Sequence, residues 1–331
     1  MSSQFLKSHV AAELVYNKRN LFWVTADSSV KEALTSLRDC NCLSLPVWDE
    51  SKKQFIGIVN TFDVLAYLSF HGFDYQGVPS PQELTAFELA HKKVSELIGV
   101  GEQIRSGVTL DGLNIMESDD TVADVMDPFT VGVQRVLVRY EGQEEVPSSY
   151  RMLSQSDMVR FLYLNEEHLD QELDKSIKEL SVGTTKVHTV NINDITLHAF
   201  REIYTDETCE AMAVVNDDGK LIATLSPSDI RAFDETEVAS VLKPVGEFLK
   251  ENNFGTLRWP VTVTQHSTLA QCMSKAVLGH LHRVWIVDAD EKPVGQVTLE
   301  DILHQFSSFP FRRLSMTDTK KLLKRAESGK A

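Results

Sequence analysis

The most regular pattern of hydrophobic and polar positions lies in residues 281–303, near the C-terminus. Two apolar runs, 284–287 and 294–297, flank an acidic turn. The pattern then reads Thr298-Leu-Glu-Asp301, with a hydroxyl residue three positions before an acidic one. Two short apolar runs around a polar turn predict a β-hairpin, and Thr298 followed by Asp301 predicts the start of a capped helix.

The same hairpin pattern occurs three more times along the chain. The apolar runs of these hairpins are residues 43–48 and 55–59, 133–138 and 150–153, and 211–215 and 221–225. A short strand and an amphipathic helix are predicted before each hairpin; before the last one, Leu269, Cys272 and Met273 recur at helical spacing. The chain is therefore expected to be an α+β protein made of four β-α-β-β-α repeats.

An aspartate stands at the start of the closing helix in every repeat: Asp63, Asp157, Asp229 and Asp301. The last three recur at an interval of about 70 residues, which indicates an internal repeat. The first interval is longer, and this indicates an insertion between the first and second repeats.

These positions divide the chain into repeats and the segments between them. The expected repeats are 21–69, 119–165, 186–235 and 259–306. The expected connecting segments are an N-terminal arm (1–20), the insertion (70–118), a linker helix (166–185), a connector (236–258) and a basic C-terminal tail (307–331). The insertion is also predicted to contain a helix over 82–98.

Composition narrows the class of protein. The chain has 331 residues, 42% of them apolar, which is enough for about two ordinary domains with substantial cores. No apolar run is long enough to span a membrane, and the N-terminus is too polar for a secretory signal. A formal net charge of −15 argues against general nucleic-acid binding, which needs a basic face. The four cysteines form no paired or metal-binding motif, which favours reduced thiols in the cytoplasm or the nucleus.

The residue three positions before each aspartate is of a helix-capping type: Asn60, Ser154, Ser226 and Thr298. One interpretation is structural, because such side chains satisfy free N–H groups at a helix start and an acidic residue there suits the helix dipole. The other interpretation is nucleotide binding, because a carboxylate can accept hydrogen bonds from both hydroxyls of a ribose and a helix N-terminus attracts phosphate. The residue pattern is compatible with both.

The repeat resembles the CBS domain, a small β-α-β-β-α unit that pairs with a second copy into a Bateman module. Four copies imply two Bateman modules forming a disk, as in the gamma (SNF4-type) subunit of AMP-activated and SNF1-type protein kinases. The closer similarity to this subunit lies in Pro46-Val-Trp-Asp49, in residues 177–184 and in the pair His282-Arg283.

The resemblance implies an adenine nucleotide (AMP, ADP or ATP) as a regulatory ligand, with no other cofactor. The ribose-binding position of the family is matched by Asp63, Asp157, Asp229 and Asp301, with the hydroxyl residues Ser154, Ser226 and Thr298 near the ligand. The implied phosphate contacts are His282, Arg283 and Arg135, and the implied base or backbone contacts are Thr189 and Thr262.

The sequence departs from the family at several positions. Leu43 and Ser44 replace the arginine of the first repeat, and Gln134 replaces the histidine of the second. Asp157 is present although the family's second repeat usually lacks an aspartate, and Glu300 stands where a small polar residue is typical. At ~4 Å and an effective dielectric constant of ~20, a carboxylate beside a phosphate costs about 4 kcal/mol. We therefore expect fewer phosphate-binding cations than the family has.

Motifs for catalysis are missing from the sequence, which contains no P-loop, no nucleophile elbow and no zinc-protease motif. The histidines likewise lack metal-ligand spacing. The expected function is that of a regulatory subunit rather than an enzyme, with the alpha and beta subunits of an SNF1/AMPK-type kinase as partners. The alternative is a CBS scaffold with degenerate nucleotide sites that regulates another partner, such as a phosphatase.

Overall fold

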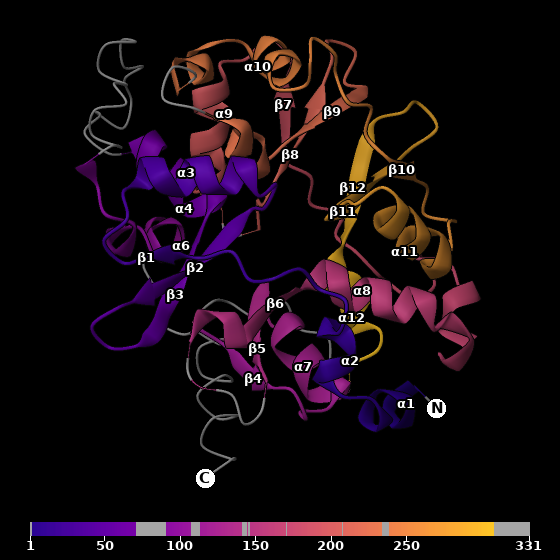
Figure 1. The fold of residues 1–331 in the computed structure, drawn as a ribbon. Coiled ribbons are helices and arrows are strands. Elements are labelled where there is room, and N and C mark those ends of the chain that lie inside the picture. The colour runs from indigo at the N-terminus through magenta and orange to yellow at the C-terminus, as the bar shows by residue number, and fades with distance from the viewer. Residues whose placement is uncertain are drawn as a thin grey trace. The chain divides into compact units, whose positions relative to one another are not determined.

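The fold is seen in a computed structural model that describes residues 2–70, 91–106, 113–140, 144, 146–169, 171–206, 208–233 and 238–307. Within these residues the chain forms four three-stranded sheets, one in each repeat (Figure 1). The basic tail beyond residue 307 and residues 82–90 of the helix predicted over 82–98 lie outside the described residues.

The elements of the repeats follow the predicted order. Repeat 1 comprises β1 (Val24–Thr25), α3 (Val30–Asp39), β2 (Ser44–Asp49), β3 (Gln54–Asn60) and α4 (Thr61–Phe70). Repeat 2 comprises β4 (Ile115–Glu117), α7 (Val122–Phe129), β5 (Arg135–Arg139), β6 (Tyr150–Ser154) and α8 (Gln155–Leu164). Repeat 3 comprises β7 (Thr189–Asn191), α9 (Thr196–Ile203), β8 (Met212–Val215), β9 (Leu221–Leu225) and the 3-10 helix η5 (Pro227–Ala232). Repeat 4 comprises β10 (Thr262–Val263), α11 (Leu269–Leu278), β11 (Arg283–Val287), β12 (Pro293–Thr298) and α12 (Leu299–His304).

Each sheet has the same topology. Its first strand runs parallel to the second, and the second runs antiparallel to the third. A parallel pair needs a crossover connection, which the first helix of each repeat supplies. The antiparallel pair is the hairpin that the apolar runs predicted, so the α+β class and the β-α-β-β-α order are confirmed.

The segments outside the repeats contain short helices. These are α1 (Ser2–Ser8), α2 (Ala11–Val15), η1 (Val94–Glu96), α6 (Val100–Ser106), η3 (Glu166–His168), η4 (Gln171–Asp174), η6 (Val238–Leu242) and α10 (Val245–Glu251). One further 3-10 turn, η2 (Pro147–Ser149), lies in the hairpin loop of repeat 2. The predicted linker helix over 166–185 is wrong, because that segment holds only two 3-10 turns among its described residues. The predicted helix over 82–98 extends too far, because only His91 of its described residues is α-helical and the short η1 follows. A dense run of charges supplies helix propensity but no apolar face, and packing decides the structure of such a segment.

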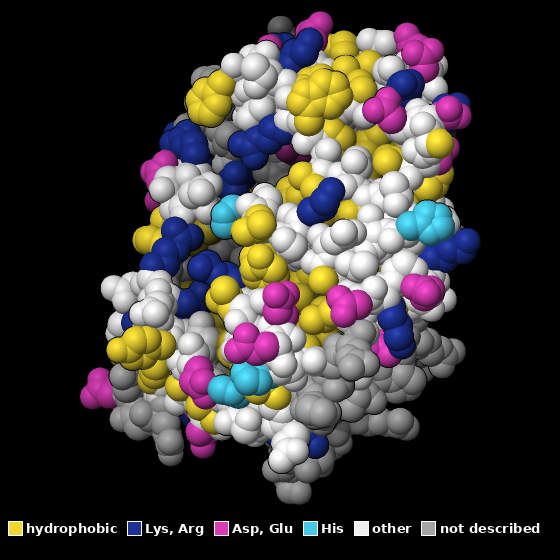
Figure 2. Space-filling model, turned by 90° about the vertical axis from the view of Figure 1, so that its right-hand side faces the viewer, with side chains coloured by type: hydrophobic (Ala, Val, Ile, Leu, Met, Phe, Trp, Pro, Cys, Tyr) yellow, Lys and Arg dark blue, Asp and Glu magenta, His cyan; other side chains and the backbone are white. Residues whose placement is uncertain are grey.

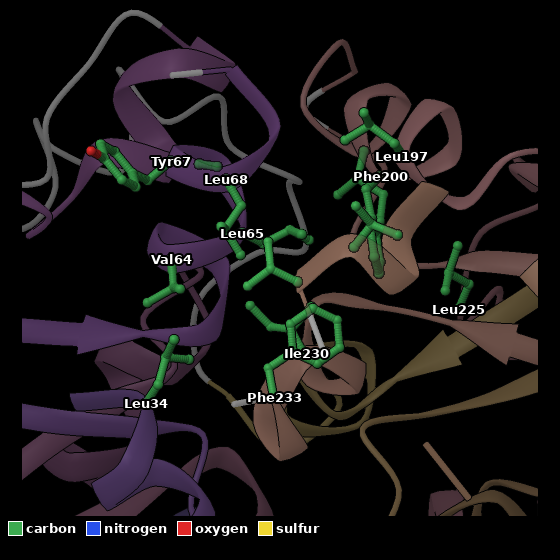
Figure 3. Packing of buried hydrophobic residues seen from close by; sticks show 14 of the residues in the cluster. Leu34, Val64, Leu65, Tyr67, Leu68, Leu197, Phe200, Leu225, Ile230 and Phe233 are labelled. Carbon is green, nitrogen blue, oxygen red and sulfur yellow. The ribbon is translucent and has the colours of Figure 1, made fainter. Parts of the chain in front are cut away.

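The chain divides into two compact units, and each joins repeats that are not neighbours in sequence. Unit 1 contains the N-terminal arm and repeats 2 and 4, and unit 2 contains repeats 1 and 3. In unit 1, α8 of repeat 2 packs against α11 and α12 of repeat 4. In unit 2, α4 of repeat 1 packs against α9 and η5 of repeat 3. Figure 3 shows this second core, in which Leu65 of α4 points toward Ile230 and Phe233.

Four connecting segments share a second repeated structure, and we call them companion segments: 10–18, 93–101, 176–184 and 244–252. Each begins with a β-bridge to the residue before the first helix of a repeat: Val10 with Thr121, Lys93 with Ser29, Ser176 with Thr268, and Pro244 with Ile195. The next residue in each segment donates its N–H to a carbonyl of that repeat at 2.8–2.9 Å. The companion segments of repeats 1 to 4 are therefore 93–101, 10–18, 244–252 and 176–184, respectively.

The packing of repeat 1 against repeat 3 predicts a large loss of stability when a phenylalanine is truncated there. Phe233 is fully buried, and its ring lies 5.8 Å from that of Phe248. Phe233→Ala should lower the free energy of unfolding of unit 2 by about 3–5 kcal/mol, because it leaves a cavity. Urea unfolding followed by intrinsic fluorescence measures the change. The matched control is Phe254→Ala, at a side chain that is 99% exposed, and it should change stability by less than about 0.5 kcal/mol.

Candidate functional site

In repeat 4 the predicted ligand residues lie at one end of the sheet. Arg283 begins β11 and pairs with Thr298 at the end of β12. The carbonyl of His282 accepts a hydrogen bond of 3.1 Å from the N–H of Leu299, the first residue of α12. His282 and Arg283 are thereby held beside the start of the helix that carries Asp301. The hairpin register produces this arrangement, since it places the first residue of one strand opposite the last of the other.

Asp301 is oriented by the helix cap. Its Oδ2 accepts hydrogen bonds of 2.8 Å from both the N–H and the hydroxyl of Thr298, and its own N–H donates to Thr298 Oγ1 at 3.1 Å. The residue is 2% exposed. Arg283 donates to the side-chain oxygen of Gln296 on the neighbouring strand at 3.3 Å.

Glu300, which the sequence marked as unfavourable for phosphate, has a basic neighbour in the structure. Its Oε1 lies 3.9 Å from Nε2 of the buried His304. Burial lowers the pKa of His304, and the negative charge of Asp301 opposes that shift. Glu300 therefore lies beside an imidazole whose protonation is disfavoured by burial and favoured by the negative charge of Asp301.

In repeat 2 a lysine from the N-terminal arm contacts the aspartate. Asp157 Oδ2 accepts hydrogen bonds from the Ser154 N–H (2.8 Å) and hydroxyl (2.7 Å). The same oxygen lies 2.5 Å from Lys18 Nζ. Arg135 occupies the position equivalent to Arg283, opposite Ser154, and donates to the carbonyl of Gln134 at 2.8 Å.

In repeat 1 the aspartate is covered by α6. Asn60 caps α4 by accepting the N–H of Asp63 at 2.9 Å. Asp63 Oδ1 accepts a hydrogen bond of 3.0 Å from the N–H of Gly101, while its buried Oδ2 has no hydrogen-bond partner among the described residues. Burial raises the pKa of Asp63 to about 7. A Cβ at position 101 would overlap the ring of Phe62, so this close approach of α6 requires glycine.

In repeat 3 the aspartate keeps the cap but lacks the strand arginine. Asp229 Oδ2 accepts hydrogen bonds from the Ser226 N–H (2.7 Å) and hydroxyl (3.3 Å). Burial raises its pKa to about 6, and the bonds from Ser226 and the positive charges of Arg258 and Arg231 oppose the shift. Met212 begins β8 and Ala211 precedes it, whereas the corresponding strands of repeats 2 and 4 begin with Arg135 and Arg283. Arg231 and Arg258, whose charges act on Asp229, were not among the residues that the resemblance indicated.

The two threonines predicted to contact the base lie on the first strands of their sheets. Thr189 pairs with Ala213 and is exposed, whereas Thr262 pairs with Trp285 and is half-buried. The carbonyl of Thr262 accepts a hydrogen bond of 2.7 Å from Lys275. Their contact with a ligand stays a prediction.

The sequence contained a signal that would have identified the companion segments. Each segment contains the same four-residue pattern. An apolar or small residue is followed two positions later by Glu and three positions later by Leu or Phe. The four examples are Ala11-Ala-Glu-Leu14, Val94-Ser-Glu-Leu97, Ile177-Lys-Glu-Leu180 and Val245-Gly-Glu-Phe248. The first residue of each is buried in its unit. In three segments the Glu side chain accepts the N–H of the residue that opens the segment, and in the fourth that residue is Pro244, which has no N–H.

Other kinds of site find no support in the part of the chain that the structure describes. His, Cys, Asp and Glu side chains form no group of three that could hold a metal ion there. None of the helices described combines the length and the apolar character needed to cross a bilayer. Figure 2 shows Lys and Arg side chains together with acidic and hydrophobic ones on the face drawn.

The raised pKa of Asp63 predicts a pH dependence of stability. Between its unfolded value near 4 and its folded value of about 7, the folded state binds a proton that the unfolded state has lost. Stability should therefore fall as pH rises through this window, by up to about 1.4 kcal/mol per pH unit from this group. Asp63→Asn should remove that slope. Urea unfolding of both proteins at pH 5 and pH 7.5 measures it, and equal slopes would contradict the buried, protonated carboxyl.

Comparison with known proteins agrees with this architecture. The CBS domain family model matches residues 11–70, 177–235 and 260–308, together just over half of the chain. Repeat 2 lies outside the matched residues, in keeping with its long hairpin loop. The first two matched stretches begin inside the companion segments 10–18 and 176–184, whereas the segments 93–101 and 244–252 lie outside the matched residues.

The similar proteins differ in their names. An Arabidopsis thaliana protein named SNF1-related protein kinase regulatory subunit gamma-like PV42a is 26% identical over 78% of this chain and 77% of its own length. Protein SDS23 of Phaeosphaeria nodorum is 25% identical over 81% of this chain, and 5'-AMP-activated protein kinase subunit gamma-3 of Sus scrofa is 21% identical over 90%. The chain spans only 52% and 56% of the lengths of these last two relatives.

A solved structure shows the same fold. Protein MJ1225 from Methanocaldococcus jannaschii, described as an archaeal homologue of the AMPK gamma subunit, superposes with a TM-score of 0.69. The match covers 90% of this chain and all of that one, at 15% identity. With four sheets of CBS topology and a family model matching most of three repeats, the chain belongs to the CBS domain family.

Proposed function

We propose that the chain is a non-catalytic regulatory subunit that binds an adenine nucleotide at repeat 4. The observation that carries the proposal is the gathering of His282, Arg283, Thr298 and Asp301 at one end of the β11–β12 hairpin. Arg283 and Asp301 suit different chemical groups. The guanidinium of Arg283 suits an anion, and the carboxylate of Asp301 suits hydrogen-bond donors. A nucleotide carries both kinds of group.

The Asp301 carboxylate suits a ribose. A carboxylate has about four acceptor positions, and the two bonds from Thr298 orient it without exhausting that capacity. Hydrogen bonds from two adjacent hydroxyls to an ionised carboxylate are charge-assisted and depend strongly on geometry. They would distinguish a ribose from a sugar that lacks one of the hydroxyls.

Arg283 and His282 suit the phosphate end of the ligand. A guanidinium presents fixed N–H donors that match phosphate oxygens, and Arg283 is held by its strand and by Gln296. Arg135, which the resemblance also implies as a phosphate contact, occupies the equivalent position in repeat 2 of the same unit. The nearby Glu300 favours a ligand with fewer phosphates, because each additional negative charge raises the repulsion.

In the other repeats the carboxylate either has a different hydrogen-bond or ion-pair partner or has no arginine at the start of the second strand. Asp63 accepts a hydrogen bond from Gly101 and is sealed by α6, and Asp157 is paired with Lys18. Asp229 lacks an arginine on its strand. We therefore assign repeat 4 as the principal site.

Binding at repeat 4 should appear as thermal stabilisation by AMP that depends on Asp301. At AMP concentrations of about 100 times the dissociation constant, unit 1 should gain about 2.7 kcal/mol of stability. Asp301→Asn should abolish the rise in melting temperature. Arg283→Ala should weaken AMP binding by about tenfold or more, because it removes hydrogen bonds to a charged group.

The matched control for Asp301→Asn is Asp124→Asn. Asp124 accepts a hydrogen bond of 2.6 Å from Thr121 and follows it by three positions at the start of α7, so it has the same capping role outside the proposed site. Asp124→Asn should lower the melting temperature equally with and without AMP. An unchanged AMP shift in Asp301→Asn, or no shift in the wild-type chain with any adenine nucleotide, would overturn the proposal.

The partner proposed for the subunit is an SNF1/AMPK-type kinase. The support is the similarity to the gamma-like protein of Arabidopsis thaliana, which is named as a kinase regulatory subunit, over more than three quarters of both chains. A nucleotide that binds two conformations of the complex with different affinity would shift the balance between them. The second candidate is a CBS regulator of a different partner, such as a phosphatase. It is supported by the similarity to SDS23 proteins only in that their name mentions no kinase.

Co-expression with kinase alpha and beta subunits should yield a stable complex in size-exclusion chromatography. A specific complex has a dissociation constant below about 1 μM, and it should therefore persist when it is diluted to micromolar concentration. The control is the same co-expression without the beta subunit. Separate elution of the chain from both kinase subunits would instead support the second candidate.

A further inference from the structure

The last position of each companion segment lies eight residues after the β-bridge that opens it. These positions are occupied by Lys18 in repeat 2, Gly101 in repeat 1, Thr184 in repeat 4 and Asn252 in repeat 3. Lys18 and Gly101 both donate to the aspartate of their repeat. Thr184 instead donates its N–H to the Gln296 carbonyl at 2.9 Å. One structural position therefore makes different contacts in different repeats, according to its residue.

Lys18 is held at this position by the fold rather than by its charge alone. The helix α2 packs on repeat 2, with Ala11 and Val15 fully buried. Two residues beyond Lys18, Asn20 accepts a hydrogen bond of 3.1 Å from Arg151. The chain on both sides of Lys18 is thus attached to the repeat whose aspartate it contacts.

The ammonium group of Lys18 makes two contacts at the cap of α8. Its Nζ lies 2.5 Å from Asp157 Oδ2 and donates to the carbonyl of Met152 at 2.7 Å. The side chains of Lys18 and Asp157 are only 27% and 28% exposed. Because an ammonium has three donors, it can satisfy the carboxylate and a carbonyl at once, much as the hydroxyls of a ribose would.

We propose that Lys18 is an internal ligand that occupies the repeat 2 aspartate and so limits the number of nucleotides that the chain binds. This inference rests on the proposed function of repeat 4. A nucleotide entering repeat 2 would have to displace a charge-assisted bond at Asp157 and leave the ammonium without it. The threonine at the equivalent position of repeat 4 sets no such barrier, because Thr184 brings no charge to Asp301.

The experiment counts AMP molecules bound per chain by isothermal titration calorimetry. The wild-type chain should bind one AMP, and Lys18→Met should bind two, since methionine keeps the aliphatic stem and removes the ammonium. Lys18→Met combined with Asp157→Asn should return to one. The control Lys7→Met, which removes an exposed charge from α1 of the same arm, should leave the number at one.

A second series separates this inference from the function of repeat 4. Asp301→Asn should bind no AMP, and Asp301→Asn with Lys18→Met should bind one. If the wild-type chain binds one AMP through Asp301 and Lys18→Met adds none, the role of Lys18 is overturned and the proposed function stands. If Lys18→Met binds AMP only through Asp157, the assignment of repeat 4 is overturned and the role of Lys18 stands. No binding by any of these proteins would overturn both.

Discussion

The hydrogen bonds between a helix-start hydroxyl and an aspartate three residues later are the constraint on which the candidate sites depend. In repeats 2 and 4 the aspartate accepts both the N–H and the hydroxyl of the capping residue within 2.8 Å. These bonds join the last residue of a hairpin to the first turn of the next helix. They also fix the carboxylate at the end of the sheet where the second strand begins, beside Arg135 or Arg283. The structural and the ligand-binding interpretations of the motif are therefore compatible, because the same carboxylate can serve both.

Repeats 2, 3 and 4 share this constraint, whereas Asn60 replaces the hydroxyl residue in repeat 1, and the repeats differ in what reaches the carboxylate. A backbone N–H from α6 contacts Asp63, and a lysine from the N-terminal arm contacts Asp157. The environment changes the chemistry accordingly: burial raises the pKa of Asp63 to about 7, whereas Asp157 has an ion-pair partner. A repeated sequence motif thus predicts a position in the fold, and the neighbouring segment decides whether that position is available.

Much of the fold followed from local patterns. Pairs of apolar runs predicted the hairpins. Among the closing helices of the four repeats, η5 alone forms as a 3-10 helix, and it begins at Pro227 after the cap Ser226. The linker over 166–185 was predicted as a helix from its charges, but its described part forms turns that dock Ile177 onto repeat 4. The short motif with Glu13, Glu96, Glu179 and Glu247 recurs as regularly as the aspartates, yet it is too short to be read as an element by periodicity.

The sequence by itself determined the repeats, the capped helices and the four aspartates, because these depend on residues within a few positions of one another. The tertiary structure decided which repeats share a core and which group meets each aspartate. Lys18 and Asp157 are 139 residues apart, and Gly101 and Asp63 are 38 apart. Contacts at such separations depend on how the companion segments pack against the repeats, and helical or strand periodicity carries no information about them.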